Sequence, residues 1–84
     1  MKHAGLAALD SLEPLLQKLR KIPGMLERKR GIFYRQGTAF LHFHEDPAGL
    51  FADLRTSADF ERYPVSSAKQ ITRLLREARR CAAR

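Results

Sequence analysis

The amino-acid sequence predicts an α+β fold in which an N-terminal and a C-terminal helix flank an antiparallel meander of three to four strands. Two observations support this class. Apolar residues near both ends of the chain recur at three- and four-residue steps, whereas the middle alternates apolar and polar residues between turn residues. Each helix has one apolar stripe, so both helices are expected on the same face of the sheet. Residues 1–84 are expected to form a single domain.

The first helix is expected at residues 11–21. Pro14 is compatible with this helix, because the first helical turn needs no backbone donor. Pro23 and Gly24 end the helix, and residues 1–10 are expected to form a tail or a short helical turn. The apolar positions at helical spacing are Leu9, Leu12, Leu16 and Leu19.

Two hairpins are expected in the middle of the chain. In the first, Gln36 and Gly37 form a two-residue turn that pairs Phe33 with Phe40. In the second, a turn at residues 45–48 leads into the next strand and places His42 opposite Phe51. These registers predict that one sheet face, away from both helices, carries Phe33, Phe40, His42, His44, Phe51, Asp53 and Arg55.

Proline and glycine positions predict where the outer strands of the sheet lie. Residues 25–30 are expected to extend the first strand, with Gly31 as a bulge. The run FERYPV is a fourth strand, which Pro64 confines to the edge of the sheet.

The last helix is the clearest element, at about residues 67–82. Ser67 and Gln70 have the spacing of a capping box, in which each side chain satisfies a backbone donor. The apolar stripe of this helix comprises Ile71, Leu74, Leu75 and Ala78.

The net charge of +7 is large for 84 residues and favours a polyanionic partner such as nucleic acid. One stripe of cations steps by four, three and four residues along the last helix: Lys69, Arg73, Arg76 and Arg80. Such a stripe suits phosphate contacts that are salt-sensitive and indifferent to sequence. It equally fits the ordinary solvated face of a helix, and no recognition motif accompanies it, so weak binding is expected.

The single cysteine and the first residues of the chain indicate the cellular compartment. Cys81 is the only cysteine, so no disulfide supports the fold, which fits a reducing cytoplasm. The first residues lack the apolar stretch of a signal peptide or a membrane span. We therefore expect a cytoplasmic protein with no membrane partner.

His42 and His44 are the candidate chemical residues. They lie two apart on a predicted strand and so share a face, with Asp53 expected diagonally from His42. Two histidines and a carboxylate suit a divalent metal ion or acid–base chemistry. The competing interpretation is that the imidazoles pack on Phe51 and hydrogen-bond Asp53. Because only two certain ligands share the face, the sequence predicts no cofactor, with a weak metal site at His42, His44 and Asp53 as the alternative.

The stretch GIFYRQGTAFLHFHEDPAGLFADLR resembles the central signature of a small family of uncharacterised bacterial proteins. It is also distantly similar to the luciferase-domain family, and the matching residues are 31–34, His42, His44, Ala52 and Asp53. This resemblance covers less than a third of the chain. It implies the fold and no established activity.

The sequence favours a binding or assembly module without catalysis of its own. Glycine-rich phosphate loops and a cysteine or serine nucleophile with a nearby base are missing from the sequence. The uncovered sheet face is expected to form the interface of a homodimer or larger assembly. Its aromatic rings would be exposed to solvent in a monomer and buried between copies of the chain. The expected interface residues are Phe33, Phe40, His42 and Phe51.

Overall fold

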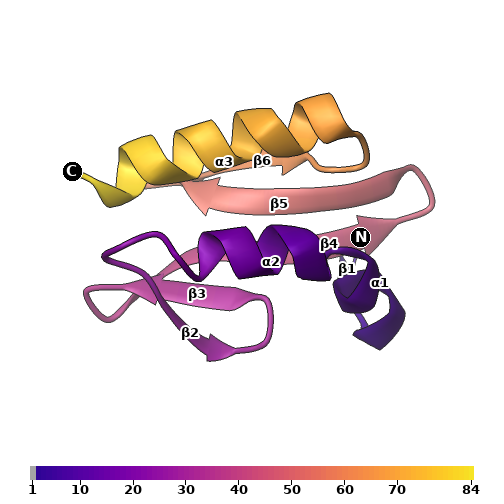
Figure 1. Ribbon diagram of the computed structural model, residues 1–84, viewed down its shortest axis with the longest axis horizontal. Helices are drawn as coiled ribbons and strands as arrows, with labels where there is room; N and C mark the ends of the chain where they lie inside the picture. Colours follow the sequence, from indigo (N-terminus) through magenta and orange to yellow (C-terminus); the bar gives the residue numbers. More distant parts are fainter. Residues whose placement is uncertain (1) are drawn as a thin grey trace.

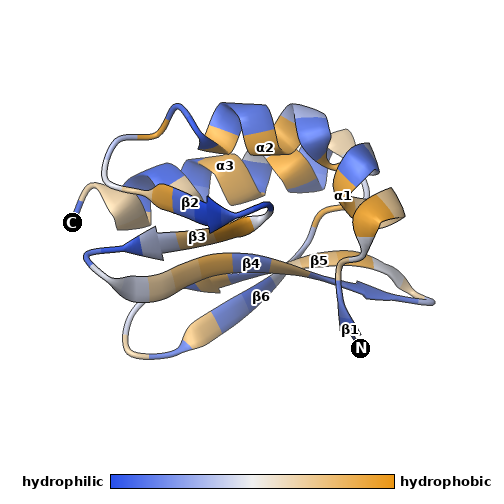
Figure 2. Ribbon diagram, turned by 90° about the horizontal axis from the view of Figure 1, so that it is seen from below, coloured by the Kyte–Doolittle hydropathy of each residue, from blue (hydrophilic) through white to orange (hydrophobic). Residues whose placement is uncertain are grey.

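The three helices of the computed structural model lie on one side of an antiparallel sheet, as Figures 1 and 2 show for the described residues, 2–84. The strands follow the order β2-β3-β4-β5-β6, and β1 pairs with β4 beside this path. The α+β fold is therefore confirmed, with more strands than expected. The strands are β1 (Lys2–His3), β2 (Leu26–Lys29), β3 (Ile32–Arg35), β4 (Thr38–Asp46), β5 (Gly49–Arg55) and β6 (Phe60–Pro64), and the helices are α1 (Leu6–Ser11), α2 (Glu13–Leu19) and α3 (Ala68–Ala82).

The helix expected at residues 11–21 corresponds to α2, and a separate short helix, α1, precedes it. Leu12 lies between the two helices with φ −91° and ψ −1°. Pro14 explains the break, because a proline has no N–H to donate to the carbonyl four residues earlier. Of the tail or short helical turn expected at residues 1–10, the helical turn is present as α1, and the short strand β1 before it is an addition to the prediction. Met1 lies outside the described residues.

The segment before β3 is a separate strand, so the prediction that residues 25–30 extend one strand is wrong. β2 and β3 form a hairpin in which Lys29 lies opposite Ile32, with Arg30 and Gly31 in the turn. Gly31 has φ +80°, and a Cβ there would lie 2.7 Å from Cδ2 of Leu9. Glycine is needed here both for its left-handed backbone and for the missing side chain.

The turn at Gln36 and Gly37 is confirmed, with both residues at positive φ. The pairing beyond it differs from the prediction. The register shifts at a bulge, so Phe33 lies opposite Leu41 and not opposite Phe40. Phe33 and Phe40 are 1% and 3% exposed and belong to the core cluster. Neither is available for the interface expected on the open face.

The β4–β5 hairpin is tighter than predicted, since Asp46 already pairs with Gly49. This moves the register by two residues, so His42 lies directly opposite Asp53 instead of Phe51. A shift of two keeps every side chain on its face, because the strand period is also two. The prediction that His42, His44 and Asp53 share one face survives for this reason.

The core fills the space between the sheet and the helices. Ser67 caps α3 through the expected capping box with Gln70, and Pro64 ends the edge strand β6. Figure 2 shows the apolar sides of the helices turned toward the sheet. The fully buried core side chains include Leu16, Leu19, Leu41, Leu54, Val65, Leu74 and Cys81.

An ion-pair network joins α2 to the β2–β3 hairpin. Arg20 donates to Glu13 at 2.6 Å and also to Glu27, while Arg30 donates to Glu13 at 2.8 Å and to Asp10 at 2.8 Å. The hydrogen bonds from Arg20 and then Arg30 lower the pKa of Glu13 from its ordinary 4.5 to about 2. Glu13 is therefore the centre of this network.

Acid should weaken the fold partly through Glu13. Because its pKa is lowered on folding, the folded protein binds fewer protons than the unfolded chain between about pH 2 and pH 4.5. Stability should fall as the pH falls through this window, and the fall should be shallower in Glu13→Gln. Urea midpoints at roughly pH 5 and pH 3 measure this. Glu61→Gln, at an exposed position of β6, is the control, and an equally steep loss in Glu13→Gln would contradict the prediction.

Candidate metal centre

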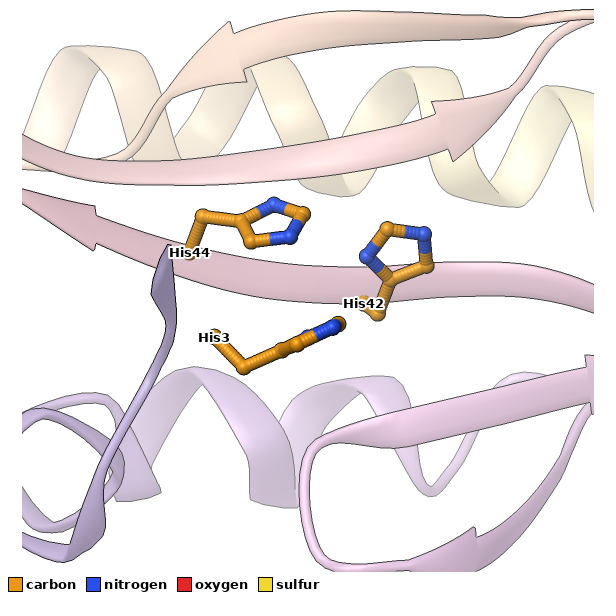
Figure 3. A group of neighbouring side chains, drawn as sticks. All are labelled: His3, His42 and His44. Carbon is orange, nitrogen blue, oxygen red and sulfur yellow. The ribbon is translucent and has the colours of Figure 1, made fainter. Parts of the chain in front are cut away.

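Three histidines converge on the sheet face that no helix covers. His42 and His44 come from β4, and His3 comes from β1 at the neighbouring position. One ring nitrogen of each lies within 4.8 Å of the corresponding nitrogens of the other two. Figure 3 shows the three rings gathered around a common point. These are all the histidines that the chain contains.

Backbone pairing holds His3 at this position. His3 lies opposite His44, and the N–H of Ala4 donates to the carbonyl of Phe43 at 3.1 Å. The carboxylate of Glu45 accepts the N–H of Gly5 at 2.6 Å, where the chain turns from β1 into α1. The backbone of His3 is therefore held against β4 by the pairing of Lys2 with Glu45 before it and by the hydrogen bonds of Ala4 and Gly5 after it.

The rings contact one another closely. Ring centroids are 4.7 Å apart for His3 and His44, 5.0 Å for His42 and His44, and 5.9 Å for His3 and His42. The edge of the cluster is closed by Phe60, whose ring lies 4.8 Å from that of His42. Within the described residues, the buried Nδ1 atoms of His42 and His44 have no hydrogen-bond partner. Buried polar atoms without a partner are uncommon in folded proteins and call for an explanation.

Asp53 lies opposite His42 on β5 and beside His44, with both carboxylate oxygens engaged. Arg62 donates to its Oδ1 at 2.7 Å and to its Oδ2 at 2.8 Å. The same Oδ2 lies 3.2 Å from Nδ1 of His44, at a geometry that falls short of a hydrogen bond. The Arg62 guanidinium lowers the pKa of Asp53, so this buried carboxyl is charged at neutral pH. The arrangement makes Asp53 a neighbour of the cluster, oriented by Arg62.

Burial favours the neutral form of His42 and His44. Burial lowers the pKa of His42 and of His44, and the negative charge of Asp53 offsets this only in part. A neutral imidazole has a free lone pair, which is the form that binds metal ions. His42 and His44 are therefore favoured in the form that coordinates a cation.

The other predicted site residues are dispersed. Phe51 is half-buried on the open face, where Arg55 lies over the ring of Phe60 at 4.4 Å. Phe33 and Phe40 lie in the core, so Phe51 is the one phenylalanine of the expected interface that lies on the open face. The homodimer itself stays a prediction, as does acid–base chemistry at His42 and Asp53. The basic stripe is exposed along α3 as expected, at Lys69, Arg73, Arg76 and Arg80.

Sequence reasoning missed His3. Its segment has no strand-like alternation, and β1 is only two residues long. The available signal was compositional, since a chain with three histidines that places two of them on one face leaves a single candidate for a third ligand.

Comparison with known proteins adds no relative. No family model, no curated protein and no solved structure matches the chain. Within residues 2–84, no helix has both the length and the apolar content needed to cross a membrane. The resemblance to the luciferase-domain family stays a prediction, and function has to be argued from the site.

Proposed function

We propose that the protein binds one divalent transition-metal ion of the zinc class through His3, His42 and His44. The observation that supports this most is the convergence of all three histidines, with nitrogens within 4.8 Å of one another. Imidazole is a preferred ligand for zinc, cobalt and copper ions. The proposal replaces Asp53 of the sequence-based ligand set with His3, since Arg62 occupies both oxygens of Asp53.

The cluster needs a small contraction to close around an ion. Zinc binds histidine nitrogens at about 2.0–2.1 Å, so nitrogens in a tetrahedral site lie roughly 3.3 Å apart. His42 and His44 are half-buried, whereas His3 is exposed. The exposed ring has the freedom to swing toward the other two, and the ion would then satisfy the unpartnered nitrogen of His42.

Asp53 suits the role of a supporting carboxylate. Histidine ligands usually donate their second ring N–H to a carboxylate or carbonyl, which fixes the tautomer and orientation of the ring. The 3.2 Å separation between Nδ1 of His44 and Oδ2 of Asp53 would allow this contact after a small rotation. Nε2 of His44 would then be the metal ligand, and Arg62 would keep the carboxylate in place.

Three histidines leave a fourth coordination position open. Zinc sites with three protein ligands hold water or another exchangeable molecule at the fourth, whereas structural sites have four protein ligands. The proposed function is therefore the binding of an ion that remains accessible from solvent, on the sheet face that no helix covers.

Titration of tag-free protein with Co²⁺ and then Zn²⁺ tests the proposal. We expect a one-to-one complex with the visible absorption of tetrahedral cobalt, which zinc displaces. His3→Ala and His42→Ala should each raise Kd at least about 10-fold, and Asp53→Asn about 10- to 100-fold.

Lys2→Ala is the matched control, because it changes the neighbouring β1 residue without removing a ligand. A cobalt spectrum that is absent in the wild type, or that survives unchanged in His3→Ala, would refute the proposed site. Circular dichroism of each variant verifies that the fold is retained.

A further inference from the structure

The helices carry a second candidate surface, on the side of the sheet opposite the histidines. α2 and α3 lie side by side, and both end at the same side of the molecule in Figure 1. Exposed cations line both helices and the residues just after them. We call this set the basic helix layer: Lys18, Lys21, Lys69, Arg73, Arg76, Arg79, Arg80 and Arg84.

The tertiary structure adds α2 to the stripe predicted from α3 alone. Lys18, Lys21 and Arg79 line a hollow of about 460 Å³ between the C-terminal ends of the two helices. Ile22 and Ala82 form part of its apolar lining. Three positive charges from two separate chain segments thus line one hollow. The basic surface predicted on α3 therefore continues onto the end of α2.

The positive charge of this layer is largely uncompensated. Glu77 is the only acidic residue of α3, and it pairs with Arg80 at 2.6 Å. Among residues 2–84, no ion pair involves Lys18, Lys21, Arg76 or Arg79, whereas Asp10, Glu13 and Glu27 are paired with arginines near α1 and β2. Much of the net charge of +7 is therefore concentrated on the helices.

We propose that the basic helix layer binds the phosphate backbone of duplex nucleic acid without sequence preference. Lys69, Arg73 and Arg76 lie on one face of a 15-residue helix, which is about 22 Å long and can reach several phosphates. Arginine and lysine contacts to phosphates position a protein on nucleic acid without reading its sequence.

Other partners fit this surface less well. A membrane-binding helix inserts its apolar face into the lipid, but Leu74, Leu75 and Ala78 of α3 are buried against the sheet. Single strands are held largely by stacking on aromatic side chains, and neither α2 nor α3 contains one. Tyr63 below α3 is only 4% exposed, with Arg73 over its ring. Protein partners are usually anchored by aromatic side chains together with arginine, and α2 and α3 supply no aromatic residue to such an interface.

Fluorescence anisotropy with 20-base-pair duplexes of two unrelated sequences tests the proposal. Both duplexes should bind with the same affinity. If about five phosphates are contacted, log K should fall against log salt with a slope of roughly −4.5. Arg76→Gln combined with Arg79→Gln should make this slope shallower by about 2 and weaken both duplexes equally.

The control removes the same charge elsewhere, through Arg28→Gln combined with Lys29→Gln on the edge strand β2. It should retain most of the wild-type affinity. Equal weakening by the two double variants would overturn the proposal, because net charge alone would then explain the binding. Tighter binding of a single strand, anionic vesicles or polyglutamate than of duplex would also overturn it, as would no binding at about 50 mM salt.

Discussion

Replacing Phe33 with alanine should lower the free energy of unfolding by about 3–5 kcal/mol. Phe33 is 1% exposed and lies in the core cluster between the sheet and the helices, so truncation would leave a cavity. A domain of this size has a total stability of roughly 4–13 kcal/mol. The variant should therefore be partly unfolded at room temperature or unfold at much lower urea, which a denaturation curve measures directly.

Phe51→Ala is the matched comparison, since Phe51 is half-buried on the open face. Phe51→Ala should lower the free energy of unfolding by well under half as much as Phe33→Ala. The two positions also separate core packing from self-association. A core residue changes stability independently of protein concentration, whereas an interface residue gives a loss that depends on it. Equal losses in the two variants, or a Phe33→Ala effect that disappears on roughly hundredfold dilution, would contradict the observed burial of Phe33.

Zinc should stabilise the fold strongly if the proposed site exists. At a free zinc concentration about 100 times Kd, the free energy of unfolding should rise by about 2.7 kcal/mol. For a domain of this size that corresponds to a Tm increase of roughly 10–20 °C. The reason is that His3 and His44 meet only through the pairing of β1 with β4, so the unfolded chain has no such site.

His3→Ala should abolish this zinc-dependent increase while changing the metal-free Tm little, because the His3 side chain is exposed. Lys2→Ala should retain the increase, and magnesium, which prefers oxygen ligands, should produce none. Thermal unfolding followed by circular dichroism, with and without zinc, provides the measurement. A zinc effect of equal size in His3→Ala would show that the ion binds elsewhere.

Local chemistry was enough to predict several elements. The Gln36-Gly37 turn was predictable because positive φ at both positions suits a glycine-containing two-residue turn. The capping box at Ser67 and Gln70 was predictable because both of its hydrogen bonds lie within four residues. The edge position of the strand ending at Pro64 followed from its missing donor.

Packing decided what local patterns could not. The bulge near Phe40 places Phe33 in the core, and it arises from the fit of β3 against β4 and the helices, not from a turn signal. Gly31 was assigned to a bulge, but the turn that it makes depends on the space left by Leu9 from α1. A single-residue difference of this kind reverses which side chains face the core.

The candidate metal centre depends both on a local sequence pattern and on tertiary packing. That His42 and His44 share a face follows from the sequence alone, because residues two apart on a strand point to the same side. The positions of His3 in the cluster and of Arg62 against Asp53 become visible only in the folded chain. Both depend on the register of strand pairs, β1 with β4 for His3 and β5 with β6 for Arg62. The energy of such pairing comes from the whole sheet, so the pattern of neighbouring residues does not encode it.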